Sequence, residues 1–84
     1  MSIRLGSSSW EIAHKVKYTP SLFYKIFSLY FIDEKKAVIF LRKTTNEPMM
    51  DCKKAIHILK EEYSDNKIMD MLDNIREYNP ELTI

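Results

Sequence analysis

Apolar side chains recur at steps of three and four residues along much of the chain, which is the spacing that places them on one face of an α-helix. The widest stripe follows Thr19-Pro20, where a hydroxyl residue and then a proline form a typical helix start. Its members are Leu22, Phe23, Ile26, Phe27, Tyr30 and Phe31. The pattern therefore predicts an amphipathic helix that begins at Pro20.

A shorter helix is predicted before it, over about residues 10–17. Ser8 and Glu11 have the spacing of a capping box, in which a hydroxyl and a carboxylate bond the free backbone N–H groups of the first turn. We expect this helix to bury Trp10, Ala13 and Val16.

Residues 37–41, Ala-Val-Ile-Phe-Leu, are apolar in every direction. Such a run fits a buried strand as well as a buried helix. We favour a helix from about Glu34 to Lys43, capped by Asp33, because no second strand pattern exists in the chain to pair with this run.

Two further stripes follow the polar turn at residues 44–48. The first predicts a fourth helix, with its buried positions at Met49, Cys52, Ile56, Leu59 and Tyr63. The second predicts a fifth helix, capped by Ser64-Asp65 and ended by Asn79-Pro80. Its buried positions are Ile68, Leu72 and Ile75.

The sequence thus predicts an all-α fold, a small single-domain bundle of four to five helices over residues 1–84. Within it we expect a loose tail at 1–9, N-terminal helices at 10–33, three helices at 34–78 and a second tail at 79–84. One glycine and three prolines are too few for a turn-rich β-sandwich.

Cys52 is the only cysteine in the sequence, which excludes an intrachain disulfide and a cysteine-based zinc site and fits a reducing, cytoplasmic location. No apolar run approaches the ~18–20 residues of a membrane span. Residues 26–32 are as apolar as a signal-peptide core. They follow a proline, lack a small-residue cleavage site and lead directly into charged residues, so we reject that interpretation.

The net charge is +1, but the charge is unevenly distributed. Residues 1–60 contain eleven Lys and Arg against five Asp and Glu, whereas residues 61–84 contain two against seven. Either the two parts neutralise each other on folding, or the acidic end docks on a basic partner.

A resemblance to a known family is carried by Leu41-Arg42, Thr45 and the run Met-Met-Asp-Cys-Lys-Lys-Ala at residues 49–55. These residues resemble the N-terminal helical module of bacterial elongation factor Ts, which has a helix ending in Leu-Arg, a Thr-Gly-x-Gly turn and then Met-Met-Asp-Cys-Lys-Lys-Ala-Leu. Residues 73–76, Asp-Asn-Ile-Arg, are similar to the end of the third helix of that module. The C-terminal domain of the ribosomal stalk protein is a weaker likeness. The resemblance implies a three-helix module of the ubiquitin-associated type over residues 34–78 and a role beside the translation apparatus.

The chain also departs from that family. Asn46 and Pro48 replace the turn glycines, and of the two only Asn46 is able to adopt a positive φ. The stretch between Ala55 and Ile68 is longer than in the family, and residues 1–33 have no counterpart in it. The Thr-Asp-Phe-Val segment used for nucleotide exchange is absent, so the resemblance does not imply exchange activity.

Cys52 lies at a predicted helix start beside two lysines, a setting that lowers the pKa of a thiol and makes it a nucleophile. It also falls on the apolar stripe with no histidine nearby in sequence, so we favour a packing role. Met49 is assigned to the core in the same way, and Met50 to a more open position.

His57 and Glu61 share a helix face at i, i+4, but two ligands do not make a metal site, and His14 would have to arrive from a distant helix. No glycine-rich phosphate loop and no Ser/His/Asp spacing can be identified. The sequence therefore predicts a protein that is not an enzyme and uses no cofactor or metal.

We therefore predict a small bacterial protein that binds another protein. The partner would be a translation-associated factor or, for an immunity protein or antitoxin, an RNA-targeting toxin. The alternative is a nucleic-acid binder of the helix-turn-helix type, because basic residues gather around the third and fourth predicted helices, although the acidic last helix would repel phosphate. The candidate partner-binding residues are Asp65, Asp70, Asp73, Glu77, Arg42, Lys43, Lys53 and Lys54.

Overall fold

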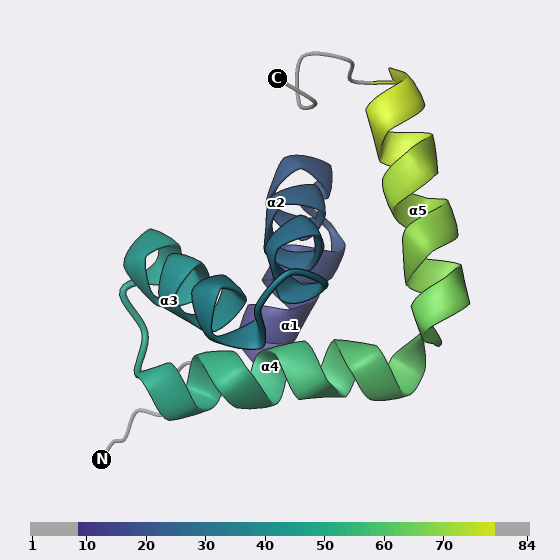
Figure 1. Ribbon diagram of the computed structural model, residues 1–84. Helices are drawn as coiled ribbons and strands as arrows, with labels where there is room; N and C mark the ends of the chain where they lie inside the picture. Colours follow the sequence, from purple (N-terminus) through teal and green to yellow (C-terminus); the bar gives the residue numbers. More distant parts are fainter. Residues whose placement is uncertain (1–8, 79–84) are drawn as a thin grey trace.

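The computed structural model describes residues 9–78, which form five α-helices joined by short turns (Figure 1). The helices are α1 (Ser9–Lys17), α2 (Pro20–Tyr30), α3 (Glu34–Thr45), α4 (Met49–Glu62) and α5 (Asp65–Tyr78). This part of the chain contains no strand, and residues 37–41 lie inside α3. The prediction of an all-α fold is confirmed.

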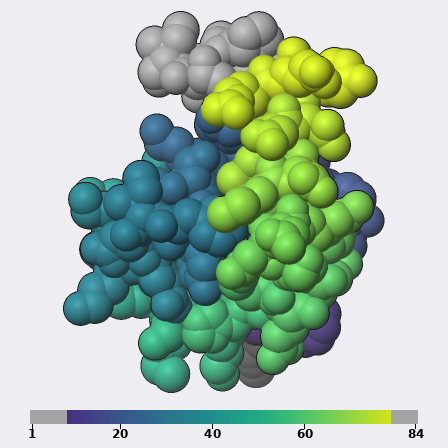
Figure 2. All heavy atoms as spheres, turned by 45° about the vertical axis from the view of Figure 1, so that its right-hand side comes forward, coloured from purple at the N-terminus to yellow at the C-terminus, as the bar shows by residue number. Residues whose placement is uncertain are grey.

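The helices pack around α4 and α2 (Figure 1). Helix α1 packs on α4, and α2 packs on both α3 and α5. Helix α5 turns away from the end of α4 and runs beside α2, where it forms a column on the surface of the space-filling view (Figures 1 and 2). None of the helices in residues 9–78 has both the length and the apolar content needed to cross a membrane.

One hydrophobic core joins all five helices. Its largest fully buried side chains include Phe23 and Phe27, whose rings lie 4.8 Å apart at their centroids in a tilted arrangement. The buried core residues are Ile12, Ala13, Val16, Leu22, Phe23, Ile26, Phe27, Ala37, Val38, Leu41, Cys52, Ala55, Ile56, Leu59 and Ile68. Helices α1 to α4 each contribute at least three of these side chains, whereas α5 contributes one.

The predicted boundary at residue 33 does not separate two cores, because α1 and α2 pack on helices that follow it and all five helices share one hydrophobic core. In particular, α5 has its main contact with α2. The likeness of residues 34–78 to a ubiquitin-associated-type module stays a prediction.

Several helix ends follow the expected local chemistry. The Asp33 carboxylate accepts a hydrogen bond of 3.0 Å from the backbone N–H of Lys35, which caps α3 as predicted. The hydroxyl of Ser64 accepts one of 3.2 Å from the N–H of Lys67 at the start of α5. Asn46 ends α3 with a φ of 60°, the left-handed conformation that its side chain tolerates. The predicted cap at Ser8 and stop at Asn79-Pro80 lie outside the described residues.

Two residues predicted to be buried, Trp10 and Met49, are exposed, so their predicted burial is wrong. Trp10 keeps 69 % of its surface exposed, because α1 turns Ile12, Ala13 and Val16 toward the core instead. Met49 is 47 % exposed, because it lies in the first turn of α4 at the edge of a groove against α3. Both errors concern a residue in the first two positions of its helix, where fewer neighbouring turns cover a side chain.

Partial burial is found at three other positions predicted to be inside. Tyr63, Leu72 and Ile75 pack against the core while part of each side chain reaches solvent. For Leu72 and Ile75 the reason is that α5 lies at the margin of the molecule, with one neighbouring helix in extensive contact.

Candidate partner-binding surfaces

Cys52 lies on the buried face of α4, with none of its surface exposed. Its Sγ lies 3.8 Å from Thr45 Oγ1 and 3.8 Å from the carbonyl oxygen of Glu47, so the thiol sits against the α3–α4 turn. Burial raises the pKa of the Cys52 thiol, and the hydrogen bond with Thr45 offsets only part of that effect. A buried thiol with a raised pKa is a poor nucleophile, which agrees with a packing role.

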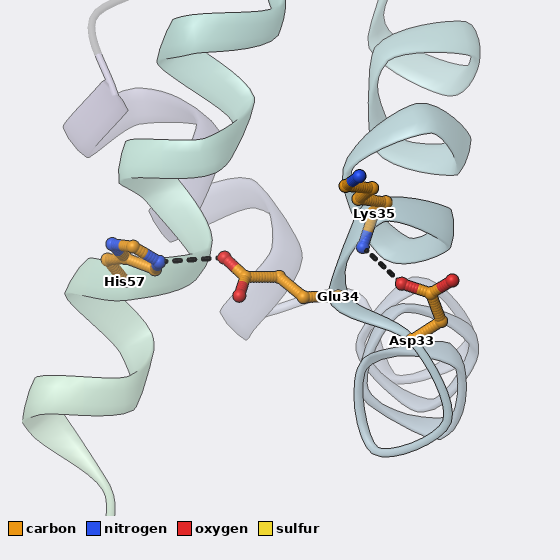
Figure 3. Close-up of polar contacts among 4 residues, drawn as sticks. All are labelled: Asp33, Glu34, Lys35 and His57. Carbon is orange, nitrogen blue, oxygen red and sulfur yellow. Dashed lines mark hydrogen bonds and ion pairs between the residues drawn. The ribbon is translucent and has the colours of Figure 1, made fainter.

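His57 projects from α4 toward Glu34 of α3 (Figure 3). Its Nε2 donates a hydrogen bond of 2.9 Å to Glu34 Oε2 in the first turn of α3. His14 lies on α1, where its ring centroid is 4.6 Å from that of Tyr18 in a tilted arrangement. Within residues 9–78 no three potential ligands converge on a metal-sized site. His57 therefore serves as a link between two helices.

Helix α5 presents an acidic outer face. Asp70, Asp73 and Glu77 recur at steps of three and four, on the side of the helix opposite the buried Ile68. All three are exposed. Asp73 pairs with Arg76 of the same helix at 3.1 Å, whereas Asp70 and Glu77 form no ion pair within the described part of the chain. We name these three residues the acidic face of α5.

Asp65, the fourth predicted acidic residue, has a different environment. It forms an ion pair with Lys60 at the α4–α5 junction. The Lys60 ammonium also lies 5.3 Å from the ring centroid of Tyr30 and 5.7 Å from that of Phe31. Such contacts with aromatic faces are attractive, so Asp65 belongs to a cluster that fixes the junction against the end of α2.

The four predicted basic residues flank the turn between α3 and α4. Arg42 and Lys43 lie in the last turn of α3, where positive charge stabilises the helix dipole, and Lys53 and Lys54 lie in α4. All four are exposed, and none forms an ion pair with another residue of the range 9–78. They remain available for contact with an anionic surface.

A groove between α3 and α4 was not predicted. It has a volume of about 440 Å³. It is lined by Glu34, Lys35, Val38, Ile39, Met49 and Lys53. The sequence did carry one indication of it: a helix that is apolar in every direction, as at residues 37–41, must leave an apolar side chain at the surface unless it is fully enclosed. Here that side chain is Ile39, which is 41 % exposed.

An ion pair also holds α1 to the end of α4. Lys17 Nζ lies 2.5 Å from Glu62 Oε2 and 5.5 Å from the ring centroid of Tyr63. The hydrogen bond between the two side chains raises the pKa of Lys17 well above its ordinary value and lowers the pKa of Glu62. The acid Glu62 is thus occupied within the fold and is not part of a free surface.

Comparisons with models of protein families, with curated proteins and with solved structures found no match to this chain.

Proposed function

We propose that this protein acts by binding another protein, and that the acidic face of α5 contacts a basic surface on that partner. The observation that carries the proposal is the way charge is distributed after folding. Only two ion pairs in residues 9–78 join the basic part, residues 1–60, to the acidic part, residues 61–84. These are Lys17–Glu62 and Lys60–Asp65.

The acidic face of α5 takes no part in the two ion pairs that join the basic and acidic parts of the chain. Asp70 and Glu77 have no cationic partner in the described structure, and Asp73 is paired only within α5. Acids at i, i+3 and i, i+4 repel one another, and each such pair lowers the stability of a helix by about 0.2–0.5 kcal/mol. A basic partner would relieve that repulsion and would be steered toward the face during encounter.

The sign of the charge favours a partner with a cationic surface. A toxin that acts on RNA needs a cationic surface for phosphate, and an inhibitor with an acidic face is suited to cover it. This supports the proposal of an immunity protein or antitoxin. The likeness of residues 41–56 to elongation factor Ts supports the other version, a translation-associated partner. In that stretch Leu41, Cys52 and Ala55 are buried and serve packing, while Met50, Lys53 and Lys54 are exposed and available for contact.

Nucleic-acid binding has one observation in its favour, the exposed and unpaired state of Arg42, Lys43, Lys53 and Lys54. The acidic face of α5 is the opposing observation, because it repels phosphate. We therefore place nucleic-acid binding second.

The proposal is tested by capturing partners from an extract of the source cells with the purified protein as bait. The variant Asp70→Lys/Glu77→Lys reverses the two unpaired acids and leaves the Asp73–Arg76 pair in place. Glu61→Lys on α4 is the control, because Glu61 is also exposed and forms no ion pair among the described residues. We expect a basic protein to be retained by the wild type and by Glu61→Lys and lost with the double variant. Equal retention by all three baits would contradict the proposal.

A further inference from the structure

The groove between α3 and α4 combines apolar walls with a cationic rim. Val38, Ile39 and Met49 supply the apolar lining, and two of them keep large exposed areas, 41 % for Ile39 and 47 % for Met49. Lys35 on α3 and Lys53 on α4 line the same groove. Both lysines are exposed, and neither pairs with an acid in residues 9–78.

Contacts on either side hold the two walls together. Near the start of α3, Glu34 bonds His57 of α4 at 2.9 Å (Figure 3). Near the turn, Thr45 of α3 lies 3.8 Å from the thiol of Cys52 in α4. Because α3 and α4 are fixed at both positions, the groove is a preformed feature, and a ligand would not have to bear the cost of opening it.

We propose that this groove binds an acidic amphipathic helix of a partner protein. The apolar ridge of such a helix, with side chains at steps of three and four, would cover Val38, Ile39 and Met49. Acidic residues beside the ridge would pair with Lys35 on one wall and Lys53 on the other. Met49 suits this role, because an unbranched thioether side chain adapts its shape to the surface that covers it.

The groove lining contains one acid, Glu34, against two cations, Lys35 and Lys53, so its formal charge is positive. Glu34 is engaged by His57, so its carboxylate already has a hydrogen-bond donor. The cations Lys35 and Lys53 outnumber this acid, and neither pairs with an acid in residues 9–78, so the rim favours an acidic ligand.

A second copy of the same chain is a poorer occupant. Its acidic helix, α5, uses Ile68, Met71, Leu72 and Ile75 against its own core. Of the apolar side chains on that helix, Met69 is the exposed one within the body of the helix, so no ridge would enter the groove. The groove and the acidic face of α5 are thus separate surfaces of opposite charge, and the proposal does not depend on the function assigned to α5.

The test uses selection from a phage-displayed library of helical peptides that is unbiased in charge. The purified protein is the target, and Ile39→Glu protein removes peptides that bind elsewhere. We expect enriched peptides to carry an apolar ridge with flanking Asp or Glu. A synthetic peptide from that pool should shift the methyl NMR signals of Val38, Ile39 and Met49. It should bind Lys53→Glu protein about tenfold or more weakly, which corresponds to about 1.4 kcal/mol.

The control variant is Lys36→Glu, which makes the same charge change on α3 at an exposed residue outside the groove. It should bind the peptide about as well as the wild type does, and so should Asp70→Lys/Glu77→Lys, which separates this proposal from the one for α5. Three outcomes would overturn the inference. The first is the absence of any enriched sequence. The second is enrichment of peptides whose apolar ridge is flanked by neutral or basic residues. The third is an equal loss of peptide affinity in Lys53→Glu and Lys36→Glu. Binding of duplex DNA or RNA oligonucleotides that displaces the peptide and is lost in Lys53→Glu would assign the groove to nucleic acid instead.

Discussion

Cys52 illustrates how the surroundings of one residue decide between chemistry and packing. Two lysines follow it in sequence and a helix starts beside it, which are features of a reactive thiol. In the structure both lysines point away from the core as exposed residues, while the thiol is fully buried against Thr45. The effect of burial is larger than that of the neighbouring charges, so the pKa of the Cys52 thiol is raised.

We therefore expect native protein to resist alkylation by iodoacetamide at neutral pH and to react completely after unfolding. Cys52→Ala should lower the free energy of unfolding by about 1 kcal/mol, because the smaller side chain leaves a modest cavity. The positive control is Cys52→Ala/Asn74→Cys, which places the only thiol on the exposed side of α5. Alkylation of native wild type as fast as that control would restore the nucleophile interpretation.

The ion pair of Lys17 and Glu62 makes a pH-dependent contribution to stability. The folded state lowers the pKa of Glu62 below its ordinary 4.5, so its contribution is complete above that pH and is lost as the pH falls through the lowered value. The pKa of Lys17 is raised above its ordinary 10.5, so its contribution is complete below that pH and is lost as the pH rises through the raised value.

Glu62→Gln should accordingly be less stable than the wild type at pH 7, and the difference should be smaller at pH 3, which lies below the ordinary pKa of this carboxyl. Urea unfolding at the two pH values measures it. Glu61→Gln, a neighbouring exposed carboxylate without an ion pair in the described structure, should show little difference at either pH. A Glu62→Gln effect that is as large at pH 3 as at pH 7 would show that the ionised carboxylate is not its cause.

At the scale of helices, periodicity predicts the helical segments except at residues 37–41, where the lack of a second strand pattern favours a helix, and capping residues predict where several helices begin. Asp33 and Ser64 act as the caps that their side chains suggest. Periodicity alone does not determine which helices pack against each other, because an apolar stripe shows that a helix face is buried but not which other helix buries it. The packing of α5 on α2 and the groove left beside Ile39 depend on those neighbour choices, so they appear only in the structure.

Helices α4 and α5 have the same length but different burial, so they allow a prediction about local stability within the molecule. Each has 14 residues, but α4 buries four side chains and α5 buries only Ile68. Elements with few buried contacts open locally at lower free energy than the core does. We expect amide hydrogens in the second half of α5 to exchange faster than those in the middle of α4, as measured by hydrogen–deuterium exchange. Equal protection of the two helices would contradict this.

For the whole molecule, the charge imbalance seen in the sequence persists in the fold. The possibility that the two parts neutralise each other applies to Glu62 and Asp65, which have cations from the basic part beside them. It does not apply to the acidic face of α5, nor to Arg42, Lys43, Lys53 and Lys54, which form no ion pair within residues 9–78. One small bundle therefore offers an acidic surface and, on different helices, an apolar groove with a cationic rim. Such an arrangement suits a protein that contacts its partner through more than one site.

The most direct test of the proposed function is the association rate with the captured partner, measured by stopped-flow or surface plasmon resonance at low and at physiological salt. If the acidic face of α5 guides binding, Asp70→Lys/Glu77→Lys should slow association strongly at low salt and less at physiological salt, because screening weakens exposed charges. Glu61→Lys should retain the wild-type rate, and both variants should keep the wild-type circular dichroism spectrum. An association rate that is the same for the wild type and the double variant at low salt would contradict the account.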